Sequence, residues 1–293
     1  MDYSNIMNRL FLRVSDEDIK NKVEEIEKKL SFNRNKDVYE KCFGYLDLTS
    51  LKPTDNTESI RVFARKASEL GKNFSHLPNI ASLCVFPAFV DVAGIELDDS
   101  EIGITSVGAG FPCSQTFLEV KMLECAMAEE NGADEIDIVM NVGQFMEGNY
   151  EEVANEIEII RQELSTETLL KVIIESGSLP GLSAVRKASV LAMAAGTDFI
   201  KTSTGKNDKG ATPEAVVVMC NAIKDYFGET GEKIGIKISG GVSDIDDAVR
   251  YYTIVETILG KDWLTPELFR IGASKLGDRL LSAIEDREIN YFG

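Results

Sequence analysis

Eight short apolar segments recur along the chain, and they constrain its fold more than any other feature. Spacings of roughly 20 to 40 residues separate them, and their near-continuous hydrophobicity is typical of parallel strands buried on both faces. Amphipathic segments such as 114–132 and 212–228 are the expected helices between them. Eight such units predict an α/β fold, a (β/α)8 TIM barrel. The segments are 42–48, 80–86, 102–107, 135–140, 169–174, 198–203, 233–238 and 269–273.

An open, doubly wound sheet is the alternative architecture, because alternation of strands and helices does not by itself show closure. None of the eight segments ends in a GxGxxG motif, which disfavours the dinucleotide-binding version of that fold. In a barrel, the residues at the carboxyl end of each strand form the active face. The charged and polar residues discussed in the following paragraphs fall at those positions, and this favours the barrel.

The segment before the first strand has the pattern of a helix. Ser15 stands three residues before Asp18, as in a capping box. Apolar residues then follow at helical spacing: Ile19, Val23, Ile26 and Leu30. We therefore expect residues 1–40 to form an additional N-terminal helical segment and residues 41–293 to form the catalytic barrel domain.

Two lysines interrupt predicted strands that are otherwise apolar. Lys201 lies in 198–203 and Lys237 in 233–238. A cation in an apolar interior costs several kcal/mol or loses its proton, so two such lysines indicate a chemical use. The 36 residues between them match one strand–helix–strand step, which would bring both side chains into one cavity. A second cation would lower the pKa of the first, as in a Schiff-base lysine.

The charge and the histidine content exclude several classes of function. A formal net charge of −18 disfavours binding to nucleic acid or to an anionic membrane. The single histidine, His76, excludes a three-histidine zinc site, so we expect no metal. Five cysteines without metal-type spacing indicate reduced thiols. The first residues resemble neither a signal peptide nor a membrane anchor, and a cytoplasmic location is expected.

Three clusters of small residues follow the last three predicted strands and indicate a phosphate site. They are 202–206, 239–242 and 272–275. Glycines allow backbone amides to approach an anion, and Ser274 is expected to cap the helix that follows it. Lys206 or Lys275 would add positive charge that this acidic protein needs to attract an anion. These loops predict a phosphorylated small molecule as ligand.

Five segments together resemble the deoxyribose-phosphate aldolase family: "GYLDLTSL", "NGADEIDIVMNVG", "DFIKTSTGK", "GIKISGGV" and "RIGASK". The resemblance runs from Phe43 to Ile284, nearly the whole predicted barrel. It implies a class I aldolase that reversibly cleaves 2-deoxy-D-ribose 5-phosphate into D-glyceraldehyde 3-phosphate and acetaldehyde, without metal or organic cofactor. The sequence departs from the family pattern at Ile238, Ser239 and Lys275. These departures are expected to change the shape of the phosphate loop and to leave the chemistry intact.

The resemblance also implies roles for individual residues. Lys201 corresponds to the Schiff-base nucleophile, Lys237 to the cation that lowers its pKa, and Asp137 to the carboxylate that moves protons through a water, supported by Asp47. Thr204 and Lys206 correspond to residues that contact the substrate hydroxyl groups and relay protons. The residues that would hold the phosphate are Gly205, Gly240, Gly241, Gly272 and Ser274.

Other interpretations of the same residues remain open. The two lysines could pair with acids in a structural salt network, Asp137 could be a structural acid, and Asp47 could hydrogen-bond Thr49. The end of the chain places Tyr291 where some family members use a terminal tyrosine. Functional alternatives are another class I aldolase, a non-catalytic phosphosugar-binding protein and a pyridoxal-phosphate enzyme. The expected assembly is a homodimer or another homo-oligomer.

Overall fold

A closed ring of parallel strands forms the centre of the computed structural model, which describes residues 9–97, 100–207 and 209–293. Within these residues the strands follow chain order around the ring, and β1 pairs with both β2 and β8. Closure excludes the open sheet and confirms the predicted barrel. The strands are β1 (Leu46–Thr49), β2 (Ser82–Val85), β3 (Gly103–Gly108), β4 (Glu135–Val139), β5 (Leu169–Ile173), β6 (Phe199–Lys201), β7 (Gly235–Ser239) and β8 (Phe269–Ala273).

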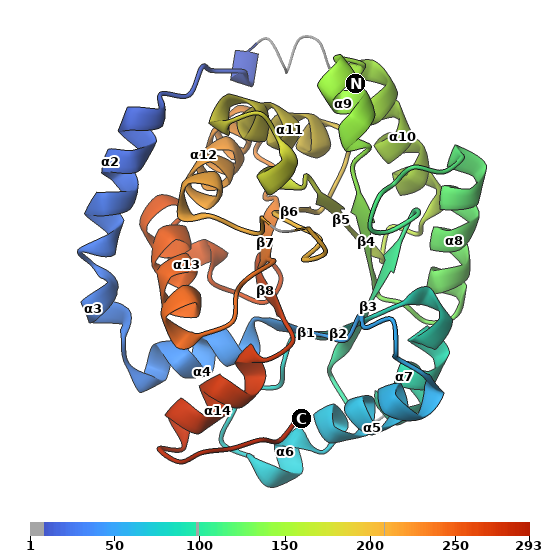
Figure 1. Cartoon of the computed structure of the whole chain (residues 1–293), viewed down its shortest axis with the longest axis vertical. Helices are drawn as coiled ribbons and strands as arrows, with labels where there is room; N and C mark the ends of the chain where they lie inside the picture. The colour runs from blue at the N-terminus through green and yellow to red at the C-terminus, as the bar shows by residue number, and fades with distance from the viewer. Residues whose placement is uncertain (1–8, 98–99, 208) are drawn as a thin grey trace.

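Helices surround this ring (Figure 1). The two amphipathic segments singled out in the sequence form α8 and α12. Helix α12 begins after Thr212, whose side chain accepts a hydrogen bond from the Ala215 N–H, and it ends just before Gly231, whose φ is +76°. The helices after β1 are α5 (Thr57–Ser68), α6 (Leu70–Asn73), α7 (Val90–Leu97), α8 (Leu118–Glu130), α9 (Val142–Glu147), α10 (Tyr150–Glu163), α11 (Leu182–Ala194), α12 (Pro213–Thr230), α13 (Ile245–Ile258) and α14 (Leu276–Ile284). Short 3-10 turns are η1 (Pro87–Phe89), η2 (Ser176–Ser178) and η3 (Lys261–Trp263).

Alternate residues of the strands serve two different environments. In β4, Ile136 and Ile138 belong to the apolar core, whereas Asp137 between them lies among charged side chains inside the ring. The strand register places Lys201 beside Lys237 on the neighbouring strand. Branched apolar residues usually fill the inside of such barrels. Here charged residues occupy much of it.

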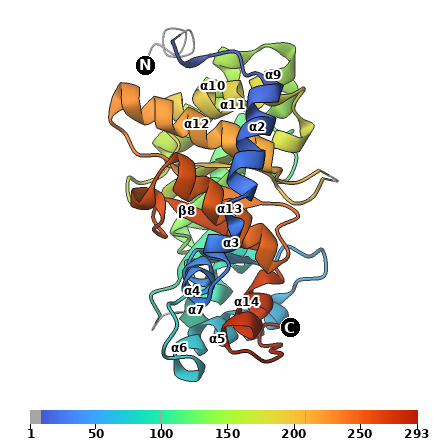
Figure 2. The same cartoon turned by 90° about the vertical axis from the view of Figure 1, so that its left-hand side faces the viewer.

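The chain begins with helices that lie outside the barrel: α2 (Asp16–Glu27), α3 (Leu30–Asn33) and α4 (Lys36–Gly44). Ser15 caps α2 by accepting a hydrogen bond of 3.3 Å from the Asp18 N–H, as predicted. Helix α2 packs along α12 and α13, as Figures 1 and 2 show from two sides. The extension therefore covers outer helices. The boundary at residue 40 stays a prediction, and α4 spans it; residues 1–8, on which the expected absence of a leader partly depends, lie outside the described residues.

The C-terminal tail packs at the end of the barrel where the strands begin. The Tyr291 hydroxyl donates to the Lys66 carbonyl at 2.8 Å and accepts from the Asn73 side chain at 3.0 Å. Its ring packs edge-on against Phe74. These partners lie at the ends of α5 and α6, which lead toward the start of β2. Tyr291 is thus held at the end opposite the catalytic face, away from the active site that the terminal tyrosine of some family members reaches.

His76 lies at this same end, between α6 and β2, where it is exposed and lies 2.8 Å from Glu285. It therefore lies away from the active face. Across the described ranges, no helix has both the length and the apolar character needed to cross a membrane.

Candidate active site

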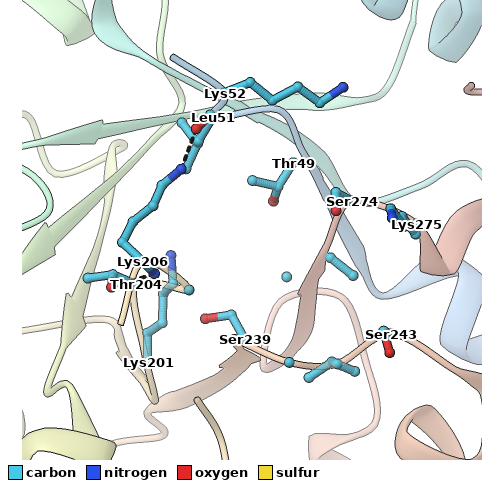
Figure 3. Close-up of a pocket in the computed structure, with 16 residues that line it drawn as sticks. Thr49, Leu51, Lys52, Lys201, Thr204, Lys206, Ser239, Ser243, Ser274 and Lys275 are labelled. Carbon is cyan, nitrogen blue, oxygen red and sulfur yellow. Dashed lines mark hydrogen bonds between the residues drawn. The ribbon is translucent and has the colours of Figure 1, made fainter. Parts of the chain in front are cut away.

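A cavity of about 330 Å³ opens at the carboxyl ends of the strands (Figure 3). The loops after β1, β6, β7 and β8 form it, so segments that are far apart in sequence meet there. Its walls contain eight of the residues to which the resemblance assigns a role, including the whole expected phosphate set. The lining residues are Thr49, Leu51, Lys52, Lys201, Thr204, Gly205, Lys206, Ser239, Gly240, Gly241, Val242, Ser243, Gly272, Ala273, Ser274 and Lys275.

Lys201 and Lys237 converge on one carboxylate oxygen inside the barrel. Lys201 is 3% exposed, and its Nζ lies 2.6 Å from Oδ2 of Asp137. Nζ of Lys237, which is fully buried, lies 2.7 Å from the same oxygen. The two amines come from neighbouring strands, β6 and β7, and the carboxylate from β4, which β5 separates from β6. The pair therefore shares one compartment, as the sequence spacing predicted.

Their surroundings push the two lysines toward different protonation states. Burial lowers the pKa of Lys201, and the neighbouring Lys237 lowers it further, against the opposing effect of Asp137. Burial also acts to lower the pKa of Lys237, but Asp137 and Asp47 together outweigh it and raise that pKa above its ordinary value. Groups whose environments separate their pKa values in this way are the usual acid and base partners of an active site. Lys201 is the better nucleophile of the two.

Both acidic residues of the site stay ionised although they are fully buried. Burial alone would raise the pKa of Asp137, yet Lys171, Lys201 and Lys237 hold it well below its ordinary value. Arg270 donates to Oδ1 of Asp47 at 2.6 Å. The other oxygen of Asp47 lies 2.6 Å from Nζ of Lys237, as an ion pair without hydrogen-bond geometry.

The alternative contact considered for Asp47 is different in the structure. The hydroxyl of Thr49 donates to the backbone carbonyl of Asp47 at 2.8 Å, and not to its carboxylate. Asp47 therefore belongs to the same set of ion pairs as the two lysines. It supports Lys237 and does not line the cavity.

Two residues expected to contact substrate have protein partners at the mouth of the barrel. The Thr204 hydroxyl donates at 2.6 Å to Glu175, which lies two residues after the end of β5 and has a left-handed φ of +50°. Lys206 Nζ donates to the Leu51 carbonyl, which links the loops after β6 and β1 (Figure 3). Glu175 thus holds the loop after β6 in place.

The expected phosphate loops combine tight backbone geometry with positive charge. Gly240 has a φ of +83°, and a Cβ there would lie 3.0 Å from Cβ of Ser203. A Cβ on Gly272 would lie 2.9 Å from Cβ of Ser239. Among the described lining residues, four are lysines and none is a carboxylate. The cavity therefore offers an anion a local positive field on a strongly acidic protein.

The prediction that Ser274 caps the following helix is wrong. Helix α14 begins at Leu276, its capping position is Lys275, and no side-chain hydrogen bond closes that end. The chain continues one residue further before it turns into helical geometry, which places the lysine where the serine was expected. Ser274 instead lines the cavity.

Three charged residues inside the barrel were not identified from the sequence: Glu135, Lys171 and Arg270. They lie beneath the lysine pair: Lys171 and Arg270 contact its acidic partners, and both donate to Glu135. The signal was present, because Lys171 interrupts the apolar segment 169–174 as Lys201 and Lys237 interrupt theirs. The same argument from the cost of a buried cation applies to it.

Comparisons with known proteins agree with this geometry. A family model described as DeoC/LacD family aldolase matches residues 49–260. Deoxyribose-phosphate aldolase from Homo sapiens is 41% identical over 246 residues, covering 80% of this chain and 77% of the human protein. The Bos taurus protein of the same name is 39% identical over 246 residues, with the same coverage, 80% and 77%.

Solved structures share the barrel. QR15, an aldolase, superposes with a TM-score of 0.67 at 30% identity, covering 84% of this chain and 95% of that one. The tetrameric deoxyribose phosphate aldolase from Aeropyrum pernix also has a TM-score of 0.67, at 24% identity, covering 92% and 98% of the two chains; this likeness concerns the fold. With a family match across most of its barrel and relatives of such identity over most of its length, the chain belongs to the DeoC/LacD family of aldolases.

Proposed function

We propose that the protein is a deoxyribose-phosphate aldolase that reversibly cleaves 2-deoxy-D-ribose 5-phosphate into D-glyceraldehyde 3-phosphate and acetaldehyde. The observation that carries this proposal is Lys201, a buried amine of lowered pKa that shares the Asp137 carboxylate with the cationic Lys237. This amine lies at the floor of a cavity lined by cations. The curated relatives named deoxyribose-phosphate aldolase support the choice of substrate.

The proposed reaction starts with the free amine of Lys201. It adds to the C1 aldehyde of the open-chain sugar, and loss of water from the carbinolamine gives a protonated imine. The C3 hydroxyl then loses its proton, the C2–C3 bond breaks, and its electron pair moves toward the iminium nitrogen to form an enamine. D-glyceraldehyde 3-phosphate leaves. Protonation at C2 and hydrolysis by water release acetaldehyde and restore the amine.

These steps need a group that moves protons beside the amine, and we assign that role to Asp137. Its Oδ2 lies 2.6 Å from Lys201 Nζ. At this position it can exchange a proton with the carbinolamine oxygen directly or through one water molecule. Lys237 stays charged beside it, favours the neutral state of Lys201, and keeps the carboxylate ionised until a proton is transferred. The groups used in this chemistry are side chains of the protein, the substrate and water.

The experiment that tests the proposal is reduction with borohydride in the presence of deoxyribose 5-phosphate, followed by peptide mass analysis. We expect a secondary amine on Lys201, because borohydride reduces the imine to a stable bond. An unmodified Lys201, or an adduct on Lys237 with Lys201 free, would contradict the proposal. A purified protein that absorbs in the visible range and carries pyridoxal phosphate would favour the alternative Schiff-base enzyme instead.

Replacing Lys275 by Gln should weaken binding of the phosphate. The side chain lines the cavity beside Ser274, and loss of one positive charge there should lower kcat/KM for deoxyribose 5-phosphate about tenfold. Activity toward deoxyribose without phosphate should stay the same, because this sugar carries no phosphate charge for Lys275 to bind. Steady-state rates on both sugars provide the measurement, with Lys72→Gln, an exposed lysine on α6, as the control. Equal losses on both sugars would place Lys275 outside the phosphate site.

We also propose that the protein acts in the cytoplasm as a homo-oligomer. The five cysteines are free thiols, which supports a reducing compartment. The tetrameric Aeropyrum pernix protein supports an assembly, whose size sedimentation analysis would give.

A further inference from the structure

A group of buried charged side chains, here called the barrel ion cluster, extends below the cavity. Its lower members are almost fully shielded from solvent: Lys171 is 0%, Glu135 4% and Arg270 5% exposed. None of these three lines the cavity. Side chains of this kind are rarely buried, so each needs a partner or a use. The members of the barrel ion cluster are Asp47, Glu135, Asp137, Lys171, Lys201, Lys237 and Arg270.

Lys171 holds Asp137 from the side that faces away from the reaction. Its Nζ donates to Oδ1 of Asp137 at 3.2 Å, whereas the other oxygen, Oδ2, faces Lys201 and Lys237. Lys171 also donates to Glu135 and, at 3.3 Å, to the Thr105 hydroxyl. Three acceptors match the three hydrogens of an ammonium group. The carboxylate of Asp137 is therefore fixed in the rotation that presents Oδ2 to the nucleophile.

Arg270 holds the second acidic residue in the same way. It donates to Asp47 at 2.6 Å through Nη1 and to Glu135 at 2.6 Å through Nη2. Glu135 thus joins Arg270 to Lys171, and the Thr105 hydroxyl donates to it at 2.7 Å. The carboxylates of Asp47 and Asp137 are each held from below by a cation, and one acid links those two cations.

The charges of the barrel ion cluster balance in only one protonation state of Lys201. The cluster has three carboxylates, and the bases other than Lys201 are three: Lys171, Lys237 and Arg270. With Lys201 as the free amine the formal charges cancel, whereas a protonated Lys201 leaves one excess positive charge in a shielded interior. Two further groups near Lys201 are the Cys84 thiol on β2 and Glu175, whose carboxylate is engaged by Thr204.

We propose that Lys171 and Glu135 are positioning residues for the aldolase reaction: they determine, through Asp137 and through the charge balance of the barrel ion cluster, the pH at which Lys201 becomes a free amine. The inference rests on the proposed function. Lys171 supplies positive charge that disfavours protonation of Lys201, and Glu135 supplies negative charge that offsets it. Neither residue touches the substrate, because neither reaches the cavity.

The test compares Lys171→Met, Glu135→Gln and the double variant by the rate of borohydride trapping of deoxyribose 5-phosphate across pH. The trapping rate of the wild type should rise with pH as Lys201 loses its proton. Lys171→Met removes a cation, so a proton on Lys201 restores the balance and the rise should move to higher pH by about one unit or more. Glu135→Gln removes an anion and should move the rise to lower pH. The double variant should return to within about half a unit of the wild type.

Opposite shifts that cancel in the double variant are an outcome that a purely structural role does not produce. Lower rates with an unmoved pH profile, or shifts of both single variants in one direction, would overturn the inference. Absence of an adduct on Lys201 in the wild type would instead refute the proposed function. Circular dichroism would show whether Lys171→Met folds. If it does not fold, the shift to lower pH of the trapping rate in the nearly isosteric Glu135→Gln still tests the inference. Lys72→Met, on the exterior, should leave the profile unchanged.

Discussion

Lys201→Met should reduce the cleavage of deoxyribose 5-phosphate by at least about 10⁴-fold, because the reaction loses the group that forms its covalent intermediate. Borohydride should then trap no sugar on the protein. The fold should persist. Burial lowers the pKa of Lys201 in the folded protein, so at neutral pH this lysine destabilises the native state relative to the unfolded chain, and methionine does not. Asp137 also keeps Lys171 and Lys237 as partners. Turnover assays, mass analysis and thermal unfolding measure the three effects.

The matched control for this variant is Lys121→Met, which removes another fully buried lysine. Lys121 belongs to α8, where it contacts Glu156 at 2.7 Å and Ser114 at 2.9 Å, outside the ring of strands. This control should lose stability but keep its activity within a few-fold of the wild type. If Lys201→Met retained substantial turnover, or if sugar were still trapped at Lys237, Lys201 would not be the nucleophile.

Asp137→Asn should have the second largest effect, on activity and stability together. An amide moves no protons, and loss of such a group usually costs about 10²–10⁴-fold in rate. Lys171, Lys201 and Lys237 would at the same time lose the charge that they share. Breaking a buried ion pair costs about 3–5 kcal/mol in the free energy of unfolding. Single-turnover trapping and denaturant unfolding would measure both losses.

A control on the same part of the chain separates these effects from a general weakening of the barrel. Asp134 is exposed at the start of β4, and its Oδ2 accepts a hydrogen bond of 2.8 Å from the Ile104 N–H. Asn keeps an acceptor there, so Asp134→Asn should leave rate and stability nearly unchanged. An Asp137→Asn enzyme that traps the sugar at the wild-type rate would show that Asp137 has only a structural role.

The fold was predictable because its pattern is local. Each strand is a short apolar segment that can be recognised on its own, and each of the eight predicted segments overlaps one of the strands. The two lysines were recognisable for the same reason, since a cation between β-branched neighbours stands out in a single segment. The interpretation as a purely structural salt network was not far from the geometry, because the lysines do pair with Asp137.

What the sequence did not show depends on contacts between distant segments. Glu135 looks like one acid in an acidic stretch, and Arg270 looks like the polar start of a strand, until the ring brings them within 2.6 Å of each other. The cap of α14 was misjudged for a related reason. A serine before a helix is a good cap only if the chain turns at that residue, and here the β8 loop runs one residue further.

The way the two chain ends are attached affects how the molecule can come apart. Arg186 on α11 donates to the Leu10 carbonyl near the start of the chain, and Tyr291 near the end bonds to Lys66 on α5. Leu10 and Tyr291 are thus each fastened to a part of the barrel that is built by a remote stretch of sequence. Local unfolding that starts near either end of the chain must first break a contact with the other half of the barrel. The strands that carry the reactive amines are therefore protected against local unfolding from both directions.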